Sequence, residues 1–304
     1  MSKSESGWLP LVRRAVLPND VLSYAQDDFA FRQQFDTVDI RQLPLADALA
    51  RAQDGAIYYS DLPAMVRAHA ERPTRHVLIT TSSGNWGAFS TAVPNRTIDW
   101  GTWENGLGRA GCSAEMVARY LDDSKVLGVL TTNHSAIVHR KILFVPVGVP
   151  EHSPIVEHLR TGQGIKTREL VINNSGWRHR AAINDTVIAN FGGAITNSYG
   201  IATDAYYAEL LAARFVLCPS GFGWDTYRIW EALCLGAIPI VERSPGWDTL
   251  LDDLPALLVG DFAQVTPALL RRVYPQIAAQ RDRFNFAKLT RQYWVAQVNA
   301  LLRG

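Results

Sequence analysis

Cysteine is scarce in this sequence, and its scarcity excludes two classes of protein. Cys112, Cys218 and Cys234 are the only three, and no two of them form a Cys-x-x-Cys pair. A small domain held together by disulfides and a cysteine-ligated zinc domain are therefore both excluded. Residues 1–10 also lack the apolar stretch of a signal peptide. We expect a reducing compartment, the cytoplasm.

Long apolar runs and an excess of one charge are missing as well. The strongly apolar stretches, such as residues 237–241, are far shorter than the ~20 residues that cross a bilayer. The 30 Lys and Arg residues balance 29 Asp and Glu residues, so no general attraction to nucleic acid exists. We expect no transmembrane segment and no nucleic-acid partner, while peripheral membrane association stays open.

Sequence patterns of metal sites are absent too. Adjacent aspartates begin at residues 27, 122 and 252, but there is no Asp-x-Asp element, and the seven histidines form no spaced ligand set. We therefore expect a protein that needs neither a metal nor a cofactor.

Short apolar strands alternate with helical segments along the chain, whose 304 residues are about twice a typical domain. Strands are predicted at residues 56–59, 76–81, 126–130, 142–148, 169–173, 215–218 and 237–241. Helices are predicted at residues 45–53, 64–70, 113–121, 181–189, 205–213, 225–235, 267–280 and 287–302. The residues before 45 are expected to be loose, and residues 150–164 to form a hinge. This alternation predicts an α/β protein with two parallel sheets facing across a cleft.

One segment, residues 215–241, has the order strand, glycine loop, helix, strand. Gly221 and Gly223 allow a sharp turn and a close approach of the backbone to a ligand. Asp225 or Thr226 can cap the following helix, and Gly236 suits its left-handed end. The free amides and the dipole at the start of a helix attract anions. We therefore expect a phosphate group to bind at the start of this helix.

Arg228 and Glu231 are three residues apart and therefore share one face of this helix. Arg228 can donate two hydrogen bonds to a diphosphate, whereas Glu231 can accept from vicinal ribose hydroxyls. The alternative is a surface ion pair, which is common at this spacing. Taken with the glycine loop, the pair predicts a nucleotide site.

Further residues of the second half are candidates for the same site. Arg178 and Arg180 follow the strand predicted at residues 169–173, and ligands collect at the carboxyl ends of parallel strands. A phosphate contact and an ordinary solvated position are equally open for both. Thr203, Asp204 and Tyr206 could border the pocket.

The run LCPSGFGWDTYRIWEALCLGAIPIV, with Trp247 after it, resembles the donor-binding motif of exostosin-type (GT47-like) glycosyltransferases, including bacterial ribitol xylosyltransferase-like proteins. The resemblance implies the GT-B architecture, two Rossmann-like, doubly wound parallel-sheet domains. It also implies that Arg228 and Glu231 bind the diphosphate and the ribose of a UDP-sugar, and that transfer to a glycan or glycoconjugate inverts the anomeric carbon. We place an acceptor domain at residues 1–152, a donor domain at 153–285 and a helix crossing back at 286–304.

A general base is expected in the first half, after a strand. Asp61 and His134 are the candidates, ahead of Glu104 and Glu151. An aspartate before Leu-Pro is more often a turn or cap residue, and a histidine is more often structural. Tryptophans at positions 86, 100 and 103 could line the acceptor site or pack in a core.

Two rival functions stay open at this point. A non-catalytic protein that binds nucleotide-sugars or glycans would keep the second-half pocket without a base. A retaining transferase of the same architecture would also place a glutamate near the donor ribose.

Overall fold

The computed structural model describes most of the chain. The described residues are 7–25, 28–29, 32, 34–39, 44, 47, 50–51, 54–80, 111–132, 139–177, 179–221, 223–244 and 246–303. The predicted helix at 45–53 lies mostly outside them, and the three tryptophans at 86, 100 and 103 lie wholly outside.

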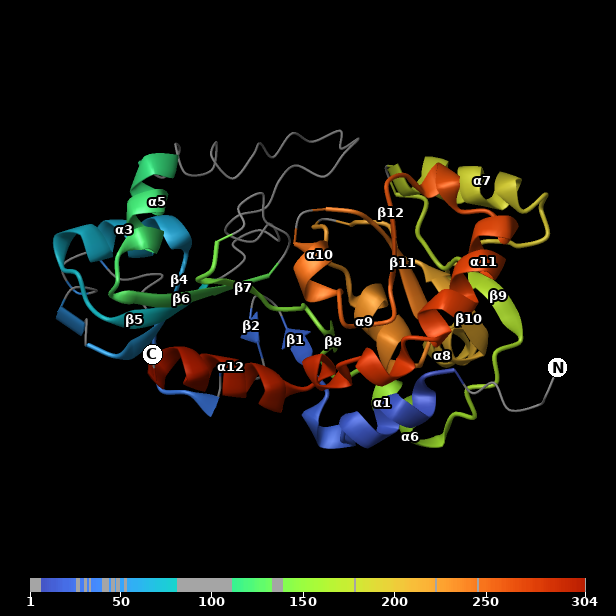
Figure 1. The fold of residues 1–304 in the computed structure, drawn as a ribbon, viewed down its shortest axis with the longest axis horizontal. Coiled ribbons are helices and arrows are strands. Elements are labelled where there is room, and N and C mark those ends of the chain that lie inside the picture. The colour runs from blue at the N-terminus through green and yellow to red at the C-terminus, as the bar shows by residue number, and fades with distance from the viewer. Residues whose placement is uncertain are drawn as a thin grey trace.

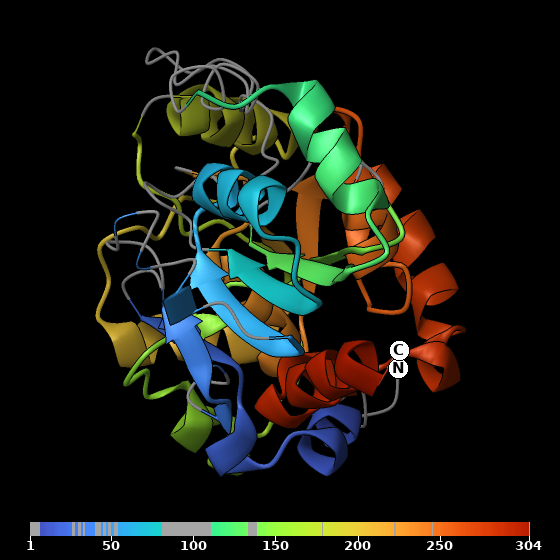
Figure 2. The ribbon, with the colours of Figure 1, turned by 90° about the vertical axis from the view of Figure 1, so that its left-hand side faces the viewer.

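The first half is built on a five-stranded parallel sheet of order β3-β4-β5-β6-β7 (Figure 1). Its strands are β3 (Thr37–Asp39), β4 (Ala56–Ser60), β5 (His76–Thr80), β6 (Val126–Thr131) and β7 (Ile142–Phe144). Helices α3 (Leu62–Glu71) and α5 (Ala114–Asp122) cover one face, and α12 (Arg291–Arg303) lies on the other (Figure 2). The strands predicted from apolar runs at 56–59, 76–81 and 126–130 are confirmed.

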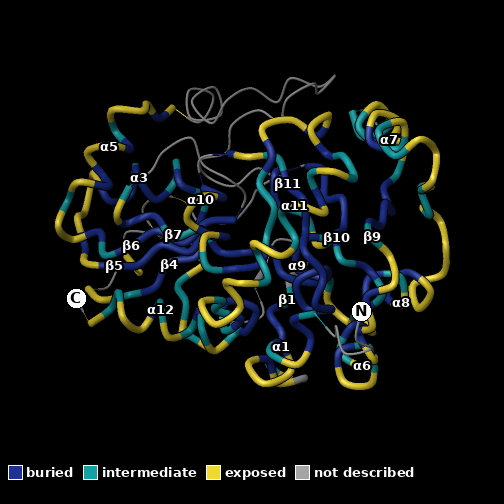
Figure 3. The backbone as a smooth tube through the Cα atoms, turned by 45° about the vertical axis from the view of Figure 1, so that its right-hand side comes forward, coloured by how far each residue is buried: buried dark blue, intermediate teal, exposed yellow. Residues whose placement is uncertain are grey.

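Alternation of side chains along these strands builds a core on each face of the sheet. Tyr58 and Leu78 pack with residues of α3 and α5, whereas Tyr59 and Ile79 belong to the cluster that contains Trp294 of α12. Successive residues of a strand point to opposite faces, so a strand covered on both sides must be apolar throughout. Figure 3 shows β4 and β5 buried along nearly their whole length.

The second half contains a four-stranded parallel sheet of order β12-β11-β10-β9. Its strands are β9 (Arg168–Val171), β10 (Ala213–Leu217), β11 (Ile238–Glu242) and β12 (Leu257–Val259). Its helices are α7 (His179–Asn190), α8 (Thr203–Ala212), α9 (Tyr227–Cys234), α10 (Trp247–Leu250) and α11 (Pro267–Ala278), with 3-10 turns η3 (Phe262–Gln264), η4 (Arg281–Arg283) and η5 (Phe286–Leu289). Helix α8 packs on β9 and β10, and α9 packs on β11.

The expected loose start of the chain is wrong for the described residues 7–25. Helix α1 (Leu9–Ala15) buries Leu9 and Val12 and packs against α6 and α9 of the second half, where Trp8 also contacts the ring of Phe284 edge-on (Figure 1). A turn η1 (Pro18–Asp20) leads to β1 (Ser23–Ala25) and β2 (Asp28–Phe29). An apolar stripe on only seven residues is too short to stand out from sequence periodicity.

The predicted hinge at residues 150–164 is ordered rather than open. Strand β8 (Val149–Pro150) pairs in parallel with β1 in a three-stranded sheet of order β2-β1-β8, and α6 (Ile155–Thr161) follows it. Ile155 and Leu159 of α6 are buried. The connection is therefore packed against the start of the chain and against helices α8 and α9 of the second half.

These two parallel sheets with their helices confirm the predicted α/β class, and the GT-B arrangement stays what the resemblance implies. The chain returns to the first sheet at its end, where α12 packs on β5 and β6. The exact domain limits stay a prediction. Among the described helices, none is long and apolar enough to cross a membrane.

Gly236 ends α9 in the left-handed conformation that its position in the sequence predicted, with φ +73°. A Cβ there would lie 2.8 Å from the backbone nitrogen of Leu9 on α1, whereas Gly193, with φ +75°, has no atom within 4 Å of that position.

We expect Gly193→Ala to lower the free energy of unfolding by about 1 kcal/mol through backbone strain alone. Gly236→Ala should lower it by roughly 2–4 kcal/mol, because α1 must also move. Urea unfolding of both variants measures the difference. Equal losses would show that α1 does not pack on the end of α9.

Candidate donor site

A cavity of about 500 Å³ opens at the start of α9, beside the carboxyl ends of the second sheet's strands. It is lined by residues of the connection, α7, α8 and α9. They are Pro150, Ser153, Pro154, Arg180, Thr203, Tyr206, Tyr207, Thr226, Tyr227, Arg228 and Glu231. The structure thus brings four of the predicted donor residues together: Arg180, Thr226, Arg228 and Glu231.

The glycine loop positions one of the arginines. Arg180 donates from Nε to the carbonyl of Ser220 (2.9 Å) and from Nη2 to that of Pro219 (3.4 Å). A Cβ on Gly221 would lie 2.6 Å from Nη2 of Arg180, so a side chain there would displace the guanidinium. Gly221 is required for this close approach and not for a positive φ. Its amide donates to the carbonyl of Gly223 (2.8 Å), which closes the turn.

Two guanidinium groups face the cavity without a carboxylate between them. Neither Arg180 nor Arg228 forms an ion pair within the described part of the chain, and the predicted alternative, a pair between Arg228 and Glu231, is not formed there. Burial, and next the charge of Arg228, lowers the pKa of Arg180 to about 10. With two arginines and one glutamate among its lining residues, the cavity carries a net positive formal charge.

Two buried polar atoms at the start of α9 have no hydrogen-bond partner. They are Oγ1 of Thr226 and Nε of Arg228. Thr226 is the N-cap of α9, and it is one of the two residues predicted for that position. Its side chain nevertheless makes no capping hydrogen bond. Buried polar groups are nearly always paired in proteins, so these atoms mark a place for a polar ligand. An anion there also meets the positive end of the helix dipole.

Glu231 lies one turn further along α9 and is 6% exposed. Its Oε2 accepts a hydrogen bond from the hydroxyl of Tyr206 (2.7 Å), and its Oε1 accepts one from Tyr207 (2.9 Å). The carboxylate is therefore held at the cavity wall by two hydroxyl groups and not by an arginine. Its charge is separated from that of Arg228 although the two residues are close in sequence.

Asp225 lies behind the cavity wall and does not line it. Its Oδ2 accepts from the amide of Val147 (2.8 Å), and its Oδ1 accepts from the indole nitrogen of Trp230 (2.6 Å). Asp225 is not the helix cap and makes no contact with the cavity; it joins the end of the first half to the start of α9. Sequence patterns missed this role because Val147 is far away along the chain.

The predicted catalytic residues are only partly described. Asp61 follows β4 and caps α3, with Oδ1 accepting from the amide of Ala64 (2.8 Å). Its predicted alternative role as a helix cap is confirmed, and its role as a base stays a prediction. His134 and Arg178 lie outside the described residues.

Sequence reasoning missed Tyr207 and Ser153, which both line the cavity. Thr203 and Tyr206 border it as considered, whereas Asp204 contacts His158 instead (3.1 Å). Two adjacent tyrosines in a helix do not form a sequence motif that predicts a binding site. Only the packing of α8 against α9 reveals that both hydroxyls reach one carboxylate.

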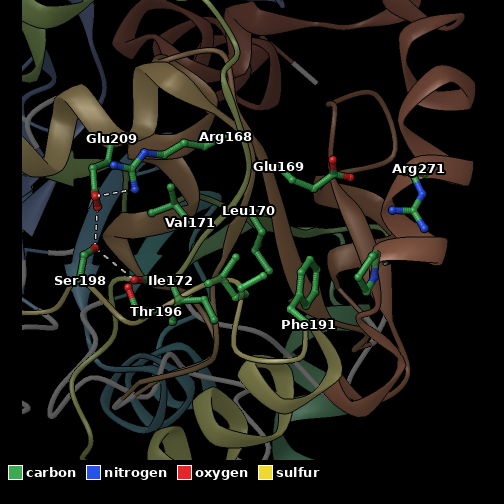
Figure 4. A pocket seen from close by; sticks show the side chains of 13 residues that line it. Arg168, Glu169, Leu170, Val171, Ile172, Phe191, Thr196, Ser198, Glu209 and Arg271 are labelled. Carbon is green, nitrogen blue, oxygen red and sulfur yellow. Dashed lines mark hydrogen bonds and ion pairs between the residues drawn. The ribbon is translucent and has the colours of Figure 1, made fainter.

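Another cavity of about 500 Å³ follows the edge strand β9, and none of the predicted donor residues lines it (Figure 4). Leu170, Ile172 and Phe191 form an apolar centre. Arg168 pairs with Glu209 (2.9 Å), which also accepts from Ser198 (2.5 Å). Two arginines and two glutamates line this cavity, so its formal charges balance in number.

We expect the buried carboxyl of Asp225 to make the stability of the protein depend on pH. Burial raises its pKa to about 7, although hydrogen bonds from Val147, Trp230 and Thr226 lower it. Between about pH 4 and pH 7 the unfolded chain has released this proton and the folded chain keeps it. The free energy of unfolding should then fall as pH rises through that window.

Asp225→Asn should show a shallower fall, and Asp185→Asn, at an exposed position on α7, should keep the wild-type slope. Urea unfolding across the window measures the slopes. The same slope in Asp225→Asn and wild type would contradict the assignment.

Comparison with known proteins finds a family model and solved structures that resemble parts of this chain. A family model described as the RXYLT1 C-terminal domain matches residues 190–248, which contain Arg228 and Glu231. No curated protein matches. Fourteen chains of solved structures match, among them one described as "OtsA apo structure", at 9% identity and a TM-score of 0.48, covering 86% of this chain and 75% of that chain. The segment that carries the candidate site is similar to part of a glycosyltransferase, as the exostosin-type motif implied.

Proposed function

We propose that this protein is a glycosyltransferase that binds a nucleoside diphosphate sugar, UDP-linked, in the cavity at the start of α9. The observation that carries the proposal is the pair of unneutralised guanidinium groups beside the unpartnered hydroxyl of Thr226. A diphosphate supplies the two negative charges and the acceptor oxygens that this arrangement lacks. The match of residues 190–248 to the C-terminal domain of RXYLT1, a ribitol xylosyltransferase, supports the same reading.

In the proposed reaction, a hydroxyl oxygen of a glycan or glycoconjugate attacks the anomeric carbon of the sugar. The bond from that carbon to the diphosphate oxygen breaks, and the electron pair leaves with the nucleoside diphosphate. Attack opposite the leaving group inverts the anomeric carbon. Arg180, Arg228 and the helix dipole stabilise the departing charge, so the proposal includes no metal. The proton of the attacking hydroxyl goes to a base, for which Asp61 and His134 are the candidates.

Buried hydroxyl groups in the first half support a ligand site there. Ser60 Oγ, Thr80 Oγ1 and Thr132 Oγ1 are buried and have no hydrogen-bond partner. They lie at or just after the carboxyl ends of β4, β5 and β6, which are neighbours in the sheet. Unpaired buried hydroxyl groups at that edge suit a ligand rich in hydroxyl groups, such as a glycan.

We expect Arg228→Ala to weaken binding of UDP about 10-fold to 100-fold, because a charge-assisted contact is worth ~1.5–3 kcal/mol. Isothermal titration calorimetry measures the affinity. Arg160→Ala, which removes an exposed arginine of α6, is the control and should bind UDP like wild type. Wild-type affinity in Arg228→Ala would show that the diphosphate binds elsewhere.

We expect Asp61→Asn to lower kcat by about 100-fold or more while leaving UDP binding unchanged. Asparagine is as good a helix N-cap as aspartate, so the cap of α3 survives while the ability to take a proton is lost. The measurement is transfer from a UDP-sugar to a glycan, run with EDTA and with Mg²⁺. Full activity in the variant would assign the base to another residue, and activity only with Mg²⁺ would refute metal independence.

A further inference from the structure

Both oxygens of the Glu231 carboxylate accept a hydrogen bond from the protein itself. Tyr206 and Tyr207 approach it at 2.7 and 2.9 Å, and their rings lie against each other with centroids 5.2 Å apart. Two adjacent residues of α8 thus reach one side chain of α9. A long, flexible glutamate is held in a single orientation at the cavity wall.

The direction of each hydrogen bond follows from the chemistry of the carboxylate. Ionised, Glu231 can only accept, so both tyrosine hydroxyls must donate to it. Burial, and next the charge of Glu231, raises the pKa of Tyr206 and of Tyr207, which keeps both hydroxyls protonated at neutral pH. A carboxylate has about four lone-pair sites, two on each oxygen. Each oxygen of Glu231 therefore keeps one acceptor site for a ligand.

Ser153, which lies in the connection between the halves, is hydrogen-bonded to Tyr207. Its Oγ lies 2.6 Å from the hydroxyl oxygen of Tyr207 and accepts from the amide of Ile155 (3.3 Å). Because the proton of Tyr207 is directed to Glu231, the hydroxyl of Ser153 must donate to Tyr207. The chain of donors runs from Ser153 through Tyr207 to Glu231, and both ends line the cavity.

We propose that Tyr206 and Tyr207, with Ser153 behind Tyr207, are positioning residues that hold Glu231 to accept two adjacent hydroxyl groups and so select ribonucleotides over 2′-deoxyribonucleotides. This inference rests on the proposed function, since it needs a nucleotide in the cavity. A vicinal diol presents one donor to each free acceptor site of the carboxylate. A 2′-deoxyribose leaves one of these buried sites unpaired, and such an unpaired group weakens binding.

The test compares the affinities of UDP, 2′-deoxy-UDP and pyrophosphate by calorimetry. Wild type should prefer UDP to 2′-deoxy-UDP by about 10-fold or more. Tyr206→Phe and Tyr207→Phe should each reduce this preference about 3-fold to 10-fold, without a change in pyrophosphate affinity. A merely structural role of the tyrosines would alter all three affinities together.

Control variants separate the possible outcomes. Tyr293→Phe removes the hydroxyl of a tyrosine on α12 that does not line the cavity, and it should keep the wild-type preference. Ser153→Ala leaves the core untouched and should reduce the preference for UDP about 2-fold to 5-fold. If a tyrosine variant fails to fold, this serine variant tests the inference instead. An unchanged preference in the folded variants overturns this inference while UDP binding upholds the proposed function. A wild type that does not bind UDP overturns both.

Discussion

Positive charge without a neutralising partner is the constraint on which this site depends. Arg180 and Arg228 are held near each other at the start of a helix whose dipole adds to their charge. Like charges placed close together in a partly buried cavity repel each other, and the folded protein must compensate that repulsion by other contacts. Arg180 is anchored by the carbonyls of Ser220 and Pro219, which need the missing side chain of Gly221. An anion bound beside the two arginines reduces the repulsion between them. The arrangement therefore favours the binding of an anion.

Negative charge is kept apart from this cationic surface by hydrogen bonding. Glu231 is close enough in sequence to pair with Arg228, and such a pair would cancel the charge that a diphosphate needs. Tyr206 and Tyr207 instead satisfy part of the carboxylate's acceptor capacity, so Glu231 and the arginines can contact different parts of one ligand. The cavity thereby presents cations for phosphate and an acceptor for hydroxyl groups side by side.

The connection between the halves is part of the same structure. Val147 donates to Asp225 behind the cavity, and Ser153 contacts Tyr207 at its wall. Residues 147–153 therefore touch the start of α9 and the tyrosines of α8. A movement of the two halves relative to each other would change the contacts that orient Glu231. The orientation of Glu231 and the position of residues 147–153 are in this way physically linked.

Local patterns in the sequence determined the α/β class, the principal strands and the helix with Arg228 and Glu231, because apolar periodicity and glycine placement act over a few residues. Gly236 belongs to this group, since its left-handed conformation follows from its place after a helix. Tertiary structure alone decided that α1 packs on α9, that Asp225 binds Val147, and that Tyr207 and Ser153 reach Glu231. Those contacts join residues far apart in the chain. No local preference encodes them, and they arise only when two packed layers bring separate segments to the same place.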